Sequence, residues 1–482
     1  MLFADVSALR KAVSGVLVLN GGVAVRNPLR LRSELVDPLV RTAVFSPDPG
    51  TREAARWAIA ESARALGAWS ASIHDLYMAR GRKECGGFTV PAINVRALAY
   101  DTARAVFRAA ARHEVGAVIF EIARSEIGYT DQRPAEYAAC VLAAAIKEGW
   151  RGPVFLQGDH YQFNAKKMAS EPAKETLAIK DLVRESIEAG FLNIDVDAST
   201  LVDLGKATLE EQQRPNFEPT AEITAHVRSL QPKGVVVGVG GEIGEVGKKN
   251  STPEELRAYV EGYKVALERR GASPGITKVS VQSGTSHGGI RLPDGSVAKV
   301  KIDLDTLATL SKVSREEYGL AGAVQHGAST LPEEAFDHFP RVEAAEIHLA
   351  TKFQDMTYDH PLFPKELLAR VNAWCRENCK DEAKEGETEA QFLVKTRKKA
   401  LGPFKREMWD LPSSVREGIA RDLEERFSLL MRKLAVVGTR PLAESHVRRV
   451  DAARPRPVSL GGVGAGAAPG KHASDEVGEG GE

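Results

Sequence analysis

Seven side chains that can bind a metal or move a proton stand where apolar segments of the sequence become polar. Each of the three histidines among them lies within two residues of a glycine and closes an apolar stretch. Imidazole and carboxylate donors from separate segments, without cysteine, suit a catalytic zinc or a similar divalent ion that keeps one coordination position open. The seven residues are His160, His287 and His326, with Asp159, Asp195, Asp197 and Glu242.

Each of these residues also has a structural interpretation when it is taken alone. A histidine at the end of a strand is more often a hydrogen-bonded structural residue than a ligand, Asp159 is a possible helix cap, and Glu242 a possible exposed loop carboxylate. Their joint occurrence at strand ends favours a shared site. The structural interpretation is kept for His74, His113, His226, His338, His360, His446 and His472.

The elements that must position these side chains are eight short apolar segments that alternate with helical patterns. Most are continuous apolar runs, which is typical of parallel strands covered on both faces. The expected strands are FTVPAINV (88–95), AVIFEIA (117–123), PVFLQGDH (153–160), FLNIDVDA (191–198), GVVVGVGGEIG (234–244), KVSVQSGTSH (278–287), AGAVQHGAS (321–329) and AEIHLATKF (345–353).

This alternation predicts the α/β class and a TIM (β/α)8 barrel. Eight strand–helix repeats in roughly 280 residues match that fold in number and size, and its chemistry lies at the carboxyl ends of the strands. The polar ends listed above would then form one rim of one barrel. An open doubly wound sheet is the alternative, but no GxGxxG loop follows the first expected strand.

The rest of the chain divides by composition. Residues 1–85 are expected to form a mostly helical N-terminal extension, 86–370 the barrel and 371–450 a charged, helical C-terminal extension. Residues 451–482 are rich in Gly, Pro, Ala and acidic residues, which predicts a disordered tail because such a segment cannot bury a core.

The bulk composition excludes several classes of partner. The 482 residues include 65 Lys and Arg and 65 Asp and Glu, so no net field favours nucleic acid or an anionic membrane. No apolar run is long enough to span a bilayer, and the first residues lack the features of a signal peptide. Only four cysteines occur, which indicates no disulfide framework and a reducing, cytoplasmic location.

Five motifs, in order over roughly residues 70–360, resemble those of one family. They are FTVPAINV, GDH (158–160), GEIGEVG (241–247), SGTSHGG (283–289) and QHGAST (325–330). Together they are similar to the class II fructose-bisphosphate aldolases, which bind a divalent metal in a TIM barrel. The resemblance implies a phosphorylated sugar as substrate and a homo-oligomer, either a dimer or a tetramer.

Residue by residue, the resemblance implies that His160, His287 and His326 bind the catalytic zinc. It implies that Asp195 and Glu242 hold a second or alternative metal position, and that Asp159 is the acid/base next to the metal. The implied substrate and phosphate contacts are Asn94, Gly288, Gly327, Ser329 and Arg291, with Arg291 where the family commonly has a lysine.

Three departures leave the substrate open. Lys248, Lys249 and Asn250 replace an acidic stretch that helps proton handling, and Ala123 stands where the family has a serine. His348 stands where the family has an asparagine that contacts substrate. The leading hypothesis is cleavage of fructose 1,6-bisphosphate to dihydroxyacetone phosphate and glyceraldehyde 3-phosphate. The alternatives are tagatose bisphosphate or another ketose phosphate, and a non-catalytic partner subunit of an aldolase.

Overall fold

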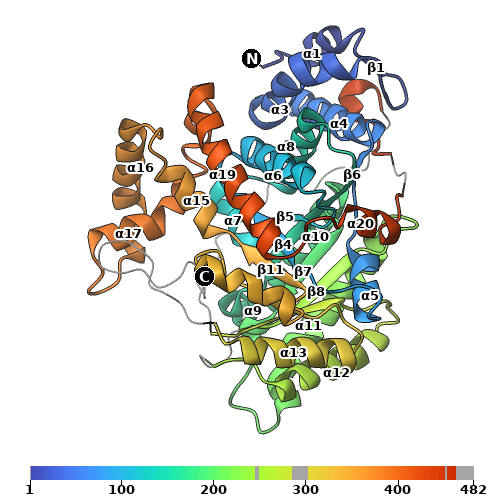
Figure 1. Cartoon of the computed structure of the whole chain (residues 1–482), viewed down its shortest axis with the longest axis vertical. Coiled ribbons are helices and arrows are strands. Elements are labelled where there is room, and N and C mark those ends of the chain that lie inside the picture. The colour runs from blue at the N-terminus through green and yellow to red at the C-terminus, as the bar shows by residue number, and fades with distance from the viewer. Residues whose placement is uncertain (1, 245–248, 285–301, 451–452, 463–482) are drawn as a thin grey trace.

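Eight parallel strands close into a barrel, which confirms the predicted α/β fold (Figure 1). The computed structural model describes residues 2–244, 249–284, 302–450 and 453–462. The last barrel strand pairs with the first, so the sheet has no open edge there. The strands are β4 (Val90–Asn94), β5 (Ile119–Ala123), β6 (Gly152–Gln162), β7 (Asn193–Asp197), β8 (Gly238–Gly244), β9 (Lys278–Val281), β10 (Ala323–Gln325) and β11 (Glu346–Leu349).

Helices between the strands cover the outside of the barrel with apolar faces. On α6 (Ala99–Arg112) the buried residues include Ala99, Ala103, Val106 and Ala110, a spacing that places them on one helical face. Side-chain caps fix where several of these helices begin, because they satisfy free backbone amides. The other covering helices are α8 (Pro134–Glu148), α10 (Pro172–Glu188), α11 (Leu209–Leu230), α12 (Pro253–Glu268), α13 (Leu304–Glu316) and α15 (Thr351–Tyr358).

The N-terminal region contains helices, a β-hairpin and one strand that joins the barrel sheet. The helices α1 (Val6–Val13), α3 (Val36–Phe45) and α4 (Pro49–Ala65) are accompanied by the hairpin β1 (Leu17–Leu19) and β2 (Val23–Val25). The short strand β3 (Ala68–Ser70) pairs in parallel with the first three residues of β6. This region therefore lies against the amino-terminal end of the third barrel strand, remote from the predicted site.

Arg80 of helix α5 (His74–Gly81) ties this region to the amino-terminal end of the barrel. Its side chain is fully buried and donates hydrogen bonds to the carbonyl oxygens of Phe88, Ala321 and Ala344. It also pairs with Glu343 at 3.0 Å. These carbonyls precede β4, β10 and β11, so one guanidinium group connects three strand beginnings to one helix.

The C-terminal helices pack on the barrel and extend to one side of it. Helix α19 (Ser413–Lys433) lies along α6, where Glu424 pairs with Arg108 and Arg112. Helices α16 (Lys365–Asn378) and α17 (Glu389–Thr396) stand at the left of Figure 1, far from the N-terminal helices. Residues 453–462, at the start of the expected disordered tail, pack on α4, where Trp57 donates to the Arg454 carbonyl at 3.1 Å.

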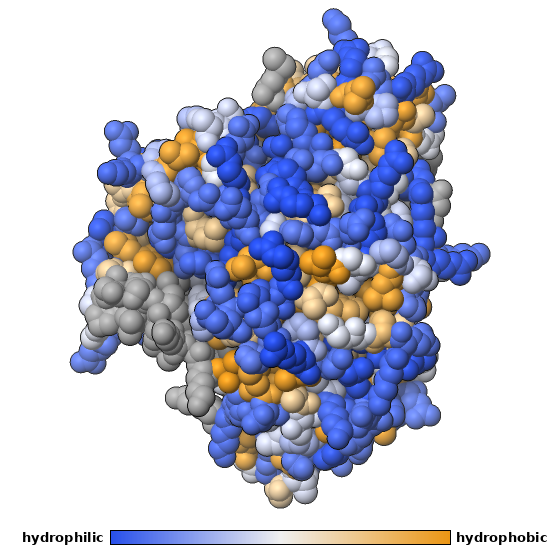
Figure 2. Space-filling model, in the orientation of Figure 1, coloured by the Kyte–Doolittle hydropathy of each residue, from blue (hydrophilic) through white to orange (hydrophobic). Residues whose placement is uncertain are grey.

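The surface in Figure 2 is largely hydrophilic, with apolar side chains in small separate groups. Within the described ranges, no helix combines the length and the apolar content that crossing a lipid bilayer requires. The apolar residues are instead concentrated under the covering helices, and the barrel interior is polar.

Candidate active site and metal-binding residues

A bulge in β6 brings two consecutive residues, Asp159 and His160, into one site. Gly158 lies opposite Ile194 and Tyr161 opposite Val196, so β6 holds one more residue than β7 over this stretch. His160 takes up the bulge with a left-handed backbone, φ 38°. In a regular strand, neighbouring side chains point to opposite faces, and a bulge re-aims them. The local irregularity therefore creates the Asp-His pair.

Gly158 is required for this turn of the chain. A Cβ atom there would lie 2.4 Å from the ring of Tyr161, which is fully buried. Tyr161 in turn contacts the Ser186 hydroxyl at 2.5 Å and so fixes the far side of the bulge. The glycine of the GDH motif thus allows the bulged strand to pass close to the Tyr161 ring.

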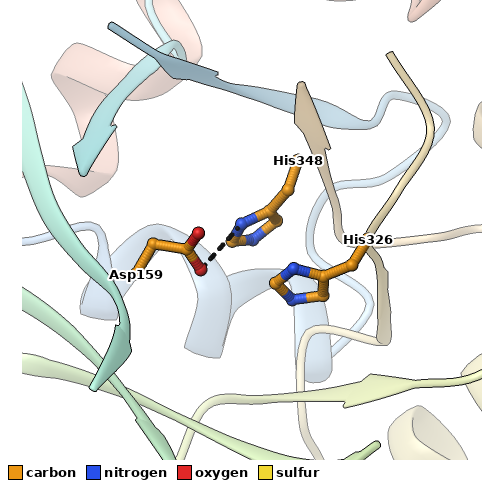
Figure 3. Close-up of side chains that lie close together, drawn as sticks. All are labelled: Asp159, His326 and His348. Atoms are coloured by element: carbon orange, nitrogen blue, oxygen red, sulfur yellow. Dashed lines mark ion pairs between the residues drawn. The ribbon is translucent and has the colours of Figure 1, made fainter. Parts of the chain in front are cut away.

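Three imidazole rings meet at the carboxyl ends of the strands. The ring centroid of His326, which follows β10, lies 4.2 Å from that of His160 and 4.0 Å from that of His348 on β11. Figure 3 shows Asp159 facing the rings of His348 and His326 across the barrel mouth. The predicted convergence of His160 and His326 is therefore present, and His348 joins them.

Carboxylates from β7 and β8 hold His160. Its Nδ1 atom lies 3.2 Å from Asp197 Oδ2 and 3.1 Å from Glu242 Oε2. Burial alone would lower the pKa of His160, but Asp159 and Glu242 raise it well above its usual value. Burial and the neighbouring Asp197 raise the pKa of Glu242 to about 7. Without a cation, this cluster therefore retains protons that a metal ion would displace.

The donor atoms fit a divalent metal. Those of His160, Glu242 and His326 lie within 4.8 Å of one another, and so do those of Asp159, His326 and His348. A third such group is Glu121, Glu346 and His348. Nitrogen and oxygen donors of this kind, without thiolates, match the chemistry of catalytic zinc and related ions. His326 Nε2 lies 2.9 Å from the Ser280 hydroxyl, which orients the ring.

A layer of charged and polar residues lies beside this site inside the barrel, centred on Lys278. Its ammonium nitrogen lies 2.8 Å from Asp195 Oδ2, 2.5 Å from Glu346 Oε1 and 2.9 Å from Gln157 Oε1. Burial alone would lower the pKa of Lys278, but Asp195 and Glu346 raise it above its usual value. Lys278 is therefore a buried cation, and Asp195 faces it.

Glycine at position 240 makes room for this ion pair. A Cβ atom there would lie 2.3 Å from Asp195 Oδ1 and 2.8 Å from the Cε atom of Lys278. Among the described residues, Asp195 is not a member of any group of donors close enough to share a metal ion. Asp195 was predicted to hold an alternative metal position, and the ammonium group of Lys278 would compete with a metal ion for its carboxylate.

His348 connects the two layers. Its Nε2 atom lies 2.7 Å from Glu346 Oε1, and its Nδ1 atom lies 2.9 Å from Glu121 Oε2 and 3.1 Å from Asp159 Oδ1. Burial lowers the pKa of His348, but Glu121 and Asp159 raise it well above its usual value. Burial raises the pKa of Glu121. The eighth-strand histidine therefore lies among carboxylates inside the barrel.

The remaining predicted residues are placed as follows. His287, Gly288 and Arg291 lie outside the described residues. Gly327 adopts a left-handed backbone, φ 66°, directly after His326, and the Ser329 hydroxyl accepts from the Lys352 amide at 3.4 Å. Asn94 ends β4 and donates to Glu126 at 2.6 Å.

Sequence reasoning did not single out Lys278, Glu121 or Glu346. All three stand inside apolar strand segments, in KVSV, IFEIA and AEIHL, where the apolar neighbours dominate the pattern. The available signal was a charged residue in the body of a strand that is covered on both faces. Burying an unpaired charge is unfavourable, so the side chain of such a residue must face the barrel interior and find a partner there.

Comparison with known proteins agrees with this architecture. Residues 81–406, more than half of the chain, match the family model described as "Fructose-bisphosphate aldolase class-II". Among curated protein sequences, none matches the chain.

Three similar solved structures have between 16% and 18% sequence identity to this chain. A probable tagatose 6 phosphate kinase from Sinorhizobium meliloti has 17% identity and a TM-score of 0.50, over 77% of this chain and 96% of its own. A putative fructose-1,6-biphosphate aldolase from Coccidioides immitis has 18% identity and a TM-score of 0.45, over 76% and 96%. The fructose-bisphosphate aldolase of Campylobacter jejuni has 16% identity and a TM-score of 0.45, over 77% and 97%.

Proposed function

Because the chain belongs to the class II fructose-bisphosphate aldolase family, we propose that it is a zinc-dependent aldolase that reversibly cleaves a ketose phosphate. Fructose 1,6-bisphosphate is the first candidate, with dihydroxyacetone phosphate and glyceraldehyde 3-phosphate as products. One observation carries the proposal: Asp159, His160 and His326 converge at the carboxyl ends of strands three and seven of a closed barrel. A non-catalytic subunit would have no need of that constellation.

His160 and His326 would hold the cation, with Glu242 as the carboxylate within reach. The family resemblance adds His287 as a third imidazole, which lies outside the described residues. When bound, a divalent ion would stabilise the negative charge that develops on substrate oxygen as the carbon–carbon bond breaks.

Asp159 is the group that moves the proton. In cleavage its carboxylate takes the proton of the C4 hydroxyl, the C3–C4 bond breaks, and the bonding electron pair stays with the dihydroxyacetone phosphate fragment. In condensation the same carboxyl returns that proton to the oxygen. Asp159 is only 4% exposed, and His348 Nδ1 lies 3.1 Å from its Oδ1 atom, which orients the carboxylate.

Gly327 and Ser329 would bind a phosphate group of the substrate. Gly327 has a left-handed backbone, a conformation in which successive amides can form an anion-binding nest, and the Ser329 hydroxyl would add a donor. The family resemblance adds Gly288 and Arg291 at the same phosphate, and Asn94 as a further substrate or phosphate contact. These roles remain predictions.

The buried lysine argues against a Schiff-base route. A nucleophilic amine must lose its proton, but the carboxylates of Asp195 and Glu346 keep the Lys278 side chain protonated. Borohydride added during turnover should therefore trap no covalent adduct. A trapped substrate on any lysine would contradict the metal-dependent proposal.

The test is a panel of fructose 1,6-bisphosphate, tagatose 1,6-bisphosphate and fructose 1-phosphate, with release of triose phosphate as the readout. Each sugar is assayed with the zinc-loaded protein and after removal of the metal by a chelator. We expect chelator-sensitive cleavage of at least one sugar, restored by added zinc. Preference for tagatose 1,6-bisphosphate would select the alternative substrate. Zinc-loaded protein that cleaves none of the sugars would overturn the proposed function.

A further inference from the structure

We propose that His348 is a metal ligand, and that Asp159, His326 and His348 form a second cation position beside the one at His160, His326 and Glu242. The inference concerns where an ion binds and does not depend on which sugar, if any, is cleaved. Both positions use His326, so one ion occupies one position at a time. The family resemblance assigns no ligand to the eighth strand, and the histidine there is a departure from its pattern.

The geometry of the three side chains fits one ion. Their donor atoms lie within 4.8 Å of one another, and His348 Nδ1 lies 3.1 Å from Asp159 Oδ1. A tetrahedral zinc bound at about 2.0–2.1 Å separates neighbouring ligand atoms by roughly 3.3 Å. All three residues are buried, and Figure 3 shows that they face a common point from β6, β11 and the end of β10. Little movement is needed to close the three donors on a cation.

The far side of the His348 ring is already arranged as it is in many metal sites. Nε2 lies 2.7 Å from Glu346 Oε1, so a carboxylate stands beside the ring nitrogen that is not next to Asp159. Glu346 is itself held by Lys278 at 2.5 Å and by the Tyr77 hydroxyl. A carboxylate that accepts from the outer nitrogen fixes the tautomer and raises the basicity of a ligating imidazole. Glu121 Oε2, 2.9 Å from Nδ1, adds a further oxygen on the metal side.

The charge balance of the barrel interior also favours a cation beside His348. Around the three imidazoles, the described part of the chain places six carboxyl groups against one lysine: Glu121, Asp159, Asp195, Asp197, Glu242 and Glu346 with Lys278. Carboxylates removed from water must be paired, protonated or bound to a metal. Lys278 serves Asp195 and Glu346, whereas Glu121 and Asp159 both lie against His348 Nδ1, at 2.9 and 3.1 Å.

The experiment measures metal binding directly. Full-length protein is freed of metal with a chelator and titrated with Co(II) and Zn(II), against a competing chromophoric chelator. The variants His348→Ala and His348→Gln are compared with the wild type and with His226→Ala. His226 is a matched control, since it lies on the covering helix α11, where its Nε2 atom lies 3.1 Å from the Lys180 carbonyl oxygen.

We expect both His348 variants to bind at least about 10-fold more weakly and to change the Co(II) absorption spectrum, and the control to do neither. Unchanged affinity and spectrum in a folded His348 variant would overturn the inference. Because a buried substitution can unfold the chain, anomalous diffraction from a wild-type crystal at the zinc edge gives an independent result. A peak within bonding distance of His348, alone or beside one at His160 and His326, supports the inference, and no peak at His348 in a zinc-saturated crystal contradicts it.

Failure of this inference and failure of the proposed function are separable. If the protein binds the ion through His348 but cleaves no ketose phosphate, the second cation position is supported and the proposed function is contradicted. If the protein cleaves a ketose phosphate but binds its ion without His348, the proposed function is supported and the second cation position is contradicted.

Discussion

Asp159 and His160 are consecutive residues of one strand, yet His160 Nε2 lies 4.0 Å from Asp159 Oδ1 in a single site. The left-handed backbone at His160 and the glycine at 158 make this possible. The carboxylate proposed to transfer the proton and the imidazole proposed to bind the metal are thereby fixed next to each other by the chain itself. No separate element is needed to align them.

Substitution of Gly158 should disrupt the site through the bulge. In Gly158→Ala the new Cβ would overlap the buried Tyr161 ring, so we expect a loss of about 1–3 kcal/mol in the free energy of unfolding and weaker zinc binding. Urea unfolding and zinc titration measure these effects. Gly22→Ala is the control, because nothing lies within 4 Å of a Cβ there. Equal stabilities of the two variants would show that the bulge tolerates a side chain.

Removal of either converging imidazole should remove the metal. His160→Ala and His326→Ala are each expected to lower zinc affinity by at least about 10–100-fold and to abolish cleavage, because each deletes a donor. The same result is expected for His287→Ala on the family resemblance. Zinc content after gel filtration is the measurement, with His446→Ala on helix α20 (Arg440–His446) as the control. Full zinc content in a variant would exclude that histidine from the site.

Loss of the Asp159 carboxylate should separate binding from chemistry. Asp159→Asn keeps a side chain of the same shape but cannot take the hydroxyl proton, so kcat should fall by about 10²–10⁴-fold. Zinc remains bound through His160 and His326 in this variant. Steady-state cleavage and metal analysis of one preparation test both statements. A variant with wild-type kcat would mean that another group moves the proton.

Lys278 should be a structural cation whose removal costs much stability. Lys278→Met leaves Asp195 and Glu346 buried without their positive partner, which should cost about 3–5 kcal/mol in the free energy of unfolding. Lys83→Met removes an exposed pair with Glu316 and should cost less than about 1 kcal/mol. Denaturant unfolding of both variants gives the comparison. Similar losses would mean that the interior accommodates unpaired carboxylates by protonating them.

His74 should make stability depend on pH in a known direction. Burial, with a smaller contribution from Arg228, lowers its pKa from 6.5 to about 4. Between these values the unfolded chain binds a proton that the folded chain does not, so stability is complete above pH 6.5 and declines as the pH falls toward 4. The decline attributable to His74 is about 3 kcal/mol. His74→Gln should flatten the curve by that amount, and parallel curves for the two proteins would refute the assignment.

The amino-acid sequence alone was sufficient for the barrel and for part of the site. Eight apolar segments with intervening helical patterns reflect strands covered on both faces, and each predicted segment overlaps one barrel strand. The position of His160 and His326 at strand ends then followed from the fold, because all carboxyl ends of parallel strands lie on one rim.

Only the tertiary structure decided which charged groups meet inside the barrel. The alternation of side chains along a strand predicts that Glu346 and His348 share a face. It does not predict that His348 lies against Asp159, because β11 and β6 are neither consecutive in the sequence nor adjacent in the sheet. The family resemblance assigns Asp195 to an alternative metal position, and only the closed sheet shows that Lys278 lies 2.8 Å from it. Sequence patterns predict which segments form strands or helices and which residues share a face. Contacts across a closed barrel depend on the stagger of the strands and on single-residue bulges, and neither changes the periodicity of the sequence.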